Sequence, residues 1–284
     1  MSSEEYMIEV QGIGKRYWVG GHHLIDNMGM HALLERAIRA PFRAMAQKFF
    51  NANPAPHFPV GEGHMRWAIR DISFNVARGE VLGILGRNGA GKSVLLKILS
   101  RITRPTEGHA RLHGSVSSML EAGTSFHPEL TGRENIRLSG AILGMGKAEI
   151  ETRMDEIIGF SEIEEYLDTP VKFYSSGMFM RLGFSVAAHL ETDIMLVDEV
   201  LTVGDGRFQR RCIDKMRSVA KSGRTILFVS HDVDIVKKIC DRAILIRDGR
   251  LEMIDTPDRV VAEHLATMSL VKTAEPVYWP SNLA

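Results

Sequence analysis

Apolar and polar residues alternate between residues 71 and 76, which places Ile72, Phe74 and Val76 on one side and polar residues on the other. This period of two predicts a strand with one buried face. Short, continuous apolar runs are typical of strands buried on both faces, as in a parallel sheet. The pattern therefore predicts an α/β fold around a parallel sheet. The apolar runs lie at 81–85, 194–197 and 225–229, and helical patterns at 208–220 and 233–240 alternate with them.

Turn residues and helix-capping residues predict further elements. Glycines flanked by short apolar runs favour hairpins, and a Thr-Pro pair favours the start of a helix. A stretch rich in Glu, Leu, Ile and Met without strand signals predicts several helices. In chain order, the expected elements are a strand at 6–10, a hairpin at 110–116 around Gly114, helices at 128–167, a hairpin at 243–254 around Asp248 and Gly249, and a helix from Thr256.

Residues 20–63 differ in character from the rest of the chain. Apolar residues recur there at helical spacing, and Arg36, Arg39 and Arg43 fall on the opposite side of the predicted helix, which Pro41 is expected to kink. A basic amphipathic helix suits a membrane surface or the cytoplasmic mouth of a permease. A helix that covers a sheet edge with solvated arginines has the same pattern, so the pattern alone leaves both interpretations open.

Charge and composition add few constraints. The 284 residues contain 35 Lys plus Arg and 35 Asp plus Glu, so the formal net charge is zero and gives no global argument for binding to nucleic acid or a membrane. No apolar run approaches the roughly 18 residues of a membrane span, and the acidic N-terminus does not resemble a signal peptide. Cys212 and Cys240 form neither a metal-binding spacing nor a disulfide framework. These features predict a protein of a reducing, cytoplasmic compartment.

Residues 86–93 fit the pattern G-x-x-x-x-G-K-[ST] between a predicted strand and a predicted helix. Glycines let the backbone approach phosphate oxygens, and successive N–H groups converge on the anion at the helix N-terminus. Lys92 is expected to reach the β- and γ-phosphates, and the Ser93 hydroxyl to ligate Mg²⁺. The full pattern disfavours the alternative of a glycine-rich turn that binds nothing. The predicted nucleotide-binding residues are Gly86, Arg87, Asn88, Gly89, Ala90, Gly91, Lys92, Ser93 and Val94.

Two carboxylates follow the apolar run at 194–197. Asp198 is placed to hold Mg²⁺, and Glu199 to polarise an attacking water as a general base. His231 follows the run at 225–229 in the same way, so it is expected at the sheet edge where a γ-phosphate would lie. A solvated turn and a structural histidine are the simpler explanations, and the position of these residues after a phosphate loop favours the catalytic one.

Together these motifs resemble those of the ATPase subunits of ABC transporters, over most of the chain outside 20–63 and the final tail. The resemblance implies that the Ser176 and Gly177 amides belong to the signature loop, open a helix and bind the ATP held by a second copy of the chain. It also implies that Asp205 lies in the loop after the general base, and that Tyr17 stacks on adenine. Strand packing is the alternative for Tyr17.

The resemblance further implies one ATP-binding domain at 1–268. Its fold would be an α/β core with a mixed sheet and an antiparallel β subdomain, joined to an α-helical subdomain. Residues 20–63 would be an inserted segment, 128–190 the helical signature subdomain and 191–255 the second part of the core. A short tail at 269–284 would follow.

The chain departs from the family pattern at several positions. Val94 stands where a hydroxyl residue is common, and Glu121 where a glutamine usually senses the γ-phosphate and metal. Glu121 is still a hard oxygen ligand for Mg²⁺, but it adds negative charge near the phosphates. In the signature loop, Tyr174 replaces the usual leucine, Ser175 keeps the usual serine, Ser176 replaces the first glycine, and a methionine replaces the glutamine. The block 120–135 and this altered signature resemble those of the ATPases that export O-antigen, capsule or teichoic-acid polysaccharides.

This resemblance implies an ATP-hydrolysing subunit that uses ATP and Mg²⁺ and works as a dimer on the cytoplasmic face of the inner membrane. A separate permease would be its partner and a lipid-linked polysaccharide the cargo, which favours a permease contact for 20–63. No nucleic-acid partner is expected. The alternatives are a soluble ABC-type ATPase that acts on ribosomes or DNA, and a nucleotide-gated regulatory subunit with weak hydrolysis. Val94, Glu121 and the altered signature motivate the second alternative.

Overall fold

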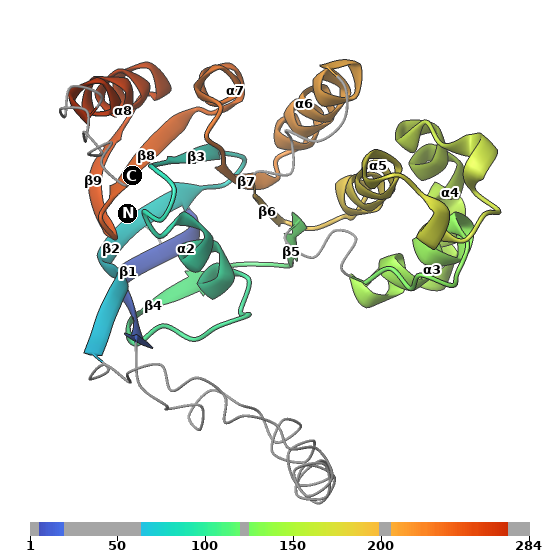
Figure 1. The fold of residues 1–284 in the computed structure, drawn as a ribbon, viewed down its shortest axis with the longest axis horizontal. Coiled ribbons are helices and arrows are strands. Elements are labelled where there is room, and N and C mark those ends of the chain that lie inside the picture. Colours follow the sequence, from blue (N-terminus) through green and yellow to red (C-terminus); the bar gives the residue numbers. More distant parts are fainter. Residues whose placement is uncertain (1–5, 20–63, 120–124, 199–205, 272–284) are drawn as a thin grey trace, which may run out of the picture. The chain divides into compact units, whose positions relative to one another are not determined.

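The chain divides into two compact units, one formed by Arg16–Trp67 and the other by Met1–Lys15 together with Ala68–Ala284. Figure 1 shows the fold of this computed structural model. The basic helix predicted within 20–63 lies outside the described residues, and none of the described helices is long and apolar enough to cross a membrane. The structure describes residues 6–19, 64–119, 125–198 and 206–271.

The larger unit is built on a six-stranded sheet, and five neighbouring strands of this sheet run parallel. The last strand pairs antiparallel to its neighbour, as predicted from the Asp248–Gly249 turn. The predicted parallel sheet is therefore confirmed. Its order is β5 (Val116–Ser118), β6 (Ile194–Val197), β7 (Thr225–Val229), β3 (Val81–Leu85), β8 (Arg242–Arg247) and β9 (Arg250–Asp255).

Helices cover both faces of this sheet, which explains why its central strands are continuously apolar. On β3, Leu82 and Ile84 pack in the cluster that contains the apolar residues of α2 (Lys92–Leu99). Val81 and Leu85 point to the other face, where a second cluster includes residues from the helices that follow. Figure 1 shows α2 on one side of the strands and the later helices on the other. These are α6 (Gly206–Lys221), α7 (Val233–Ile239) and α8 (Pro257–Val271).

A three-stranded sheet in the order β2-β1-β4 lies over the α2 side, and β4 (Glu107–Leu112) pairs antiparallel with β1. The alternation predicted for 71–76 is confirmed within β2 (His64–Ala77), where the apolar residues are buried and the polar ones exposed. The first strand, β1 (Tyr6–Val19), is longer than predicted. Its pairing with β4 shifts register between Gln11 and Gly14, so the strand continues through an irregularity beyond the predicted end at residue 10.

The hairpin predicted around Gly114 is wrong. Its two arms belong to different sheets, because β4 pairs with β1 whereas β5 pairs in parallel with β6. The Asp193 carboxylate holds the connection by accepting hydrogen bonds from the Ser115 N–H and hydroxyl, both at 2.8 Å. The chain does turn at Gly114, but the residues after the turn are held by Asp193, which lies far along the chain, and they enter the other sheet.

Several helices form a subdomain between β5 and β6, as predicted. Their apolar side chains make a separate core that includes Ile136, Met154 and Leu182. The first helix begins with a capping box, in which the Thr131 side chain and the Glu134 side chain each bind the other's backbone N–H. The elements are α3 (Gly132–Ile142), α4 (Lys147–Ser161), the short 3-10 helices η2 (Glu164–Tyr166) and η3 (Val171–Phe173), and α5 (Ser176–Ala188).

Candidate functional site

The glycine-rich loop joins β3 to α2, and two of its glycines are in close contact with neighbouring strands. Gly86 has a φ of 154°, and a Cβ there would lie 2.4 Å from the Ile246 carbonyl oxygen. Gly91 has a φ of 105°, and a Cβ there would lie 2.3 Å from a methyl carbon of Ile69. Any other side chain would force the loop away from β8 and β2. The loop backbone is therefore held tightly at both ends.

Lys92 lies inside this loop and is 6% exposed. Its Nζ donates hydrogen bonds to the Gly86 carbonyl at 2.7 Å and to the Arg87 carbonyl at 3.2 Å. The β8–β9 turn supports the far side, where the Gly249 N–H donates to the Ala90 carbonyl at 3.1 Å. The loop thus holds the Lys92 ammonium group against its own main chain, at the position from which the lysine of such a loop reaches a bound phosphate.

Ser93, Asp198 and His231 follow the carboxyl ends of three strands. These strands, β3, β6 and β7, lie in the order β6-β7-β3, so the three residues emerge at one edge of the sheet. Ser93 and His231 are exposed, and Asp198 is half-buried. Ligands of open α/β sheets bind at this edge. The structure therefore places Lys92, Ser93, Asp198 and His231 on the same side of the sheet as predicted from the sequence.

The donor set at this edge suits Mg²⁺. Within the described ranges, no three His, Cys, Asp or Glu residues are close enough together to form a metal cage. A hydroxyl at Ser93 and a carboxylate at Asp198 are hard oxygen donors, and Mg²⁺ typically takes one or two protein ligands and completes its shell with water and phosphate. Three predicted residues, Glu121, Glu199 and Asp205, lie outside the described residues.

The remaining predicted residues lie elsewhere. Ser176 and Gly177 begin the first turn of α5, and Ser175 is its N-cap. The Ser175 hydroxyl accepts a hydrogen bond from the Met178 N–H at 3.2 Å. The N–H groups of the first helical turn have no partner within the helix, and Ser176 is exposed, so an anion can approach them. Tyr17 is half-buried on β1 within the Arg16–Trp67 unit, and its contact with adenine stays a prediction.

Sequence reasoning missed His264 of α8, which is 7% exposed. Burial lowers its pKa, and the nearby charges of Lys92, Arg247 and Arg87 lower the pKa further. Two of these cations belong to the phosphate loop, and α8 contacts β3, the strand that leads into that loop. A histidine on an amphipathic helix gives no signal of this contact in the sequence, since the two segments are far apart along the chain.

Known proteins resemble this chain in sequence over most of its length. The family described as ABC transporter matches residues 69–202. The O-antigen export system ATP-binding protein RfbB of Klebsiella pneumoniae is 48% identical over 76% of this chain and 88% of that protein. The teichoic acids export ATP-binding protein TagH of Lactococcus lactis is 43% identical over 70% of this chain and 42% of that protein.

Solved structures resemble the fold. An ATP-binding subunit of an ABC transporter has a TM-score of 0.68 at 20% identity and covers 94% of this chain and 100% of that chain. The ATP-binding cassette MJ0796, in a dimeric post-hydrolysis state bound to ADP and Pi, has a TM-score of 0.65 at 19% identity and covers 88% and 99%. At this level of identity the likeness shows the fold, and it confirms the fold class predicted from the sequence.

Proposed function

The chain belongs to the ABC transporter family, and we propose that it is the ATP-hydrolysing subunit of an exporter of lipid-linked polysaccharide that works with a separate permease. The observation that carries this proposal is the 48% identity with an O-antigen export ATP-binding protein over 88% of that relative. The teichoic-acid export relative supports the same class of cargo. The chain is an ATP-binding subunit of a membrane exporter, and our proposal adds that the exported cargo is a lipid-linked polysaccharide.

The phosphate loop provides the chemistry for binding ATP. Lys92 exchanges its bonds to the Gly86 and Arg87 carbonyls for bonds to the β- and γ-phosphates, so the ammonium group is already desolvated in the place where it is needed. The Ser93 hydroxyl and the Asp198 carboxylate would hold Mg²⁺, which would neutralise negative charge on the phosphates. The nucleotide-binding role extends over residues 86–94, although Val94 brings no hydroxyl.

Hydrolysis requires a base and a contact with the γ-phosphate. We assign the base to Glu199, which follows Asp198 at the end of β6 and orients the attacking water. His231 contacts the γ-phosphate from the end of the neighbouring strand β7. Glu121 adds a carboxylate to the metal environment.

A second copy of the chain completes the site. The exposed first turn of α5 offers the Ser176 and Gly177 N–H groups to the nucleotide held by the partner copy. We also assign nucleotide contacts to Asp205, which follows the base in the sequence, and to Tyr17, which would stack on the adenine. The permease holds the dimer at the cytoplasmic face of the membrane, and the 20–63 segment faces the permease.

The replacement Glu199→Gln tests the catalytic assignment. It removes the base and leaves the phosphate loop intact, so purified protein should bind ATP with unchanged affinity, lose turnover and accumulate as an ATP-bound dimer. Glu165→Gln, on an exposed carboxylate of η2, serves as the control. Turnover of the Glu199→Gln protein at the wild-type rate excludes Glu199 as the base.

The replacement Lys92→Ala tests the phosphate loop. Loss of the ammonium group should weaken ATP binding by at least tenfold, whereas Lys97→Ala, on the exposed side of the same helix, should leave binding unchanged. Titration with a fluorescent ATP analogue measures both. Equal affinities in the two variants exclude the loop as the nucleotide site.

Deletion of the gene tests the cargo. Surface polysaccharide should disappear and lipid-linked polymer should accumulate inside the cell, and wild-type protein but not Glu199→Gln should restore export. A nucleotide-gated regulatory subunit predicts restoration by both. Unchanged surface polysaccharide in the deletion strain rejects the export proposal and leaves the ATPase assignment standing.

A further inference from the structure

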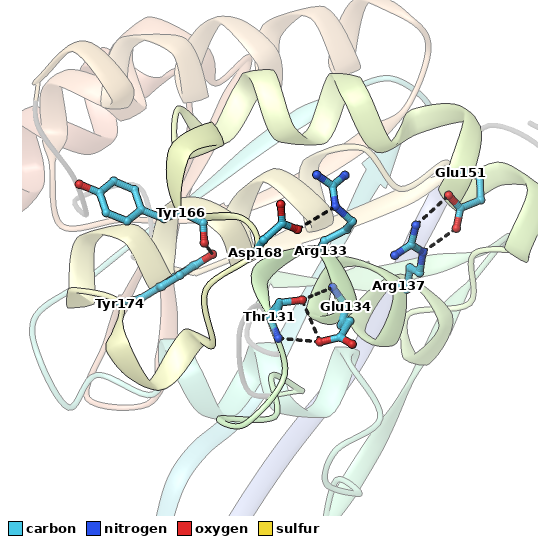
Figure 2. Close-up of polar contacts among 8 residues, drawn as sticks. All are labelled: Thr131, Arg133, Glu134, Arg137, Glu151, Tyr166, Asp168 and Tyr174. Atoms are coloured by element: carbon cyan, nitrogen blue, oxygen red, sulfur yellow. Dashed lines mark hydrogen bonds and ion pairs between the residues drawn. The ribbon is translucent and has the colours of Figure 1, made fainter.

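The hydroxyl of Tyr174 occupies an unusual position at the entrance to α5. Its Oη donates a hydrogen bond to the main-chain carbonyl of Tyr166 at 2.8 Å (Figure 2). A Cβ at Gly132 would lie 2.2 Å from the same oxygen. Gly132 is the buried first residue of α3, so the hydroxyl fills the space that a side chain there would take. Tyr174 therefore joins η2, α3 and α5 at one point.

The partners of Tyr174 lie in segments that are joined to one another by hydrogen bonds. The segments before α3 and before α5 are paired, with the Val171 N–H donating to the Leu130 carbonyl at 3.0 Å and the Arg133 N–H to the Leu167 carbonyl at 3.1 Å. The Arg133 guanidinium also binds the Asp168 carboxylate at 3.2 Å. Figure 2 shows this ion pair beside the Thr131–Glu134 capping box, both close to the Tyr174 contact. The hydroxyl is thus anchored to parts of the chain that are themselves fixed.

Tyr174 also adjoins the turn that carries the signature amides. It directly precedes the N-cap Ser175, and its ring packs on the apolar core of the helical subdomain, as does Phe179 one turn into the helix. A hydrophobic residue before the N-cap that packs near the fourth helical residue fixes the direction in which the chain enters the helix. Burial raises the pKa of the Tyr174 phenol, so the hydroxyl keeps its donor proton at neutral pH.

We propose that Tyr174 is a positioning residue that sets the direction of the first turn of α5, and with it the Ser176 and Gly177 N–H groups that bind the nucleotide of the second copy. This inference rests on the proposed function. An apolar ring fills the same space but has no donor for the Tyr166 carbonyl. The hydroxyl therefore holds the turn against η2, and its loss affects closure of the composite site more than binding of ATP to the phosphate loop.

The first test compares Tyr174→Phe with Tyr166→Phe. The matched control removes an equal hydroxyl from a ring that is 50% exposed, because Tyr166 takes part in the contact through its main-chain oxygen. Tyr174→Phe should lower kcat about fivefold to tenfold, the effect of one lost hydrogen bond. Binding of a fluorescent ATP analogue should stay unchanged, and half-maximal activity should need a higher protein concentration. Tyr166→Phe should match the wild type in all three measurements.

The second test uses the space beside Gly132. Gly132→Ala places a methyl carbon 2.2 Å from Tyr174 Oη, so the hydroxyl must move and kcat should fall at least as far as in Tyr174→Phe. In the double variant Gly132→Ala with Tyr174→Phe, the nearest remaining atoms are the Leu167 carbonyl oxygen at 3.2 Å and a ring carbon at 3.3 Å. The neighbours then need to shift by only a few tenths of an ångström, so the alanine should cost much less than it does beside the tyrosine. Gly159→Ala, where a Cβ meets nothing within 4 Å, controls for adding a methyl group to a helix.

These outcomes decide the inference. The positioning role is supported if kcat falls less in the double variant than the two single variants together would predict, and if ATP affinity is unchanged. Equal kcat in wild type and Tyr174→Phe overturns it, and so do variants whose melting temperature falls while kcat is preserved, because the contact is then purely structural. Wild-type protein without ATPase activity overturns the proposed function together with this inference, so the two failures are distinguishable.

Discussion

Glu162 forms a charged junction between the helical subdomain and the sheet. It ends α4 with a φ of 56°, and its carboxylate binds Arg181 of α5 at 3.2 Å and Arg211 of α6. Each arginine also lies 4.9 Å from the centre of an aromatic ring, Arg211 over Phe160 and Arg181 over Phe208. Arg207 of α6 also lies 3.9 Å from this carboxylate, so Glu162 joins three arginines and three helices. We predict that Glu162→Gln destabilises the protein substantially.

The magnitude follows from the burial of the pair. An ion pair between exposed side chains contributes about 0–1 kcal/mol, whereas removing one partner of a buried pair costs about 3–5 kcal/mol because a charge is left unpaired. The Glu162 side chain is 25% exposed and that of Arg181 is 17% exposed, so the case lies between these limits. After discounting for solvent, we expect a loss of about 2 kcal/mol, which lowers the midpoint of thermal unfolding by roughly 4–8 °C in a protein of this size.

Thermal unfolding followed by circular dichroism measures this effect. Glu151→Gln is the matched control, because it breaks an ion pair with Arg137 in the same subdomain in which both side chains are 44% exposed. The control should shift the midpoint by less than about 4 °C, and by less than Glu162→Gln does. Added salt should leave the difference between the two variants largely intact, since partly buried pairs are screened little. Equal shifts in both variants would refute the reasoning.

Three further predictions rest on single contacts. Gly91→Ala should unfold at a lower temperature than Gly144→Ala, because both have a positive φ but only Gly91 has a neighbour within 4 Å of the added carbon. The pKa of His264 is lowered in the folded protein, so the unfolded chain binds a proton at this residue more readily. The stability of the folded protein should therefore fall as the pH drops below the ordinary pKa of 6.5. His264→Gln should weaken this pH dependence of the melting temperature between about pH 5 and 7. Thr131→Ala should cost about 1 kcal/mol in denaturant unfolding, the usual value of an N-cap.

Local patterns predicted the parts of the fold that depend on local physics. The apolar runs of β3, β6 and β7 require burial on both faces, and the sheet provides it. Asp248 and Gly249 both adopt the left-handed conformation that a tight hairpin needs, so the turn between β8 and β9 could be identified from two residues. The phosphate loop could be predicted for the same reason, because its glycines and lysine lie within one short stretch of sequence.

Contacts between distant residues could not be predicted in this way. Gly114 signals a turn, but the carboxylate that directs the chain into the second sheet belongs to Asp193. Glu162 gives no sign in the sequence that it will meet arginines of two later helices. Tyr174 is a departure from the expected signature, and the reason for the hydroxyl becomes apparent only beside Gly132. Pairings of this kind depend on tertiary packing, which periodicity does not describe.

The packing of α5 limits how the signature amides can move. Leu182 and Val186 belong to the core of the helical subdomain, whereas Phe184 and Ala187 belong to the core on the sheet. Because one helix serves both cores, it cannot rotate about its axis without disturbing packing on each side. The Glu162 carboxylate adds a second link between α4, α5 and α6. A displacement of the first turn of α5 relative to the phosphate loop would therefore disturb both cores and the ion pairs that link α4, α5 and α6.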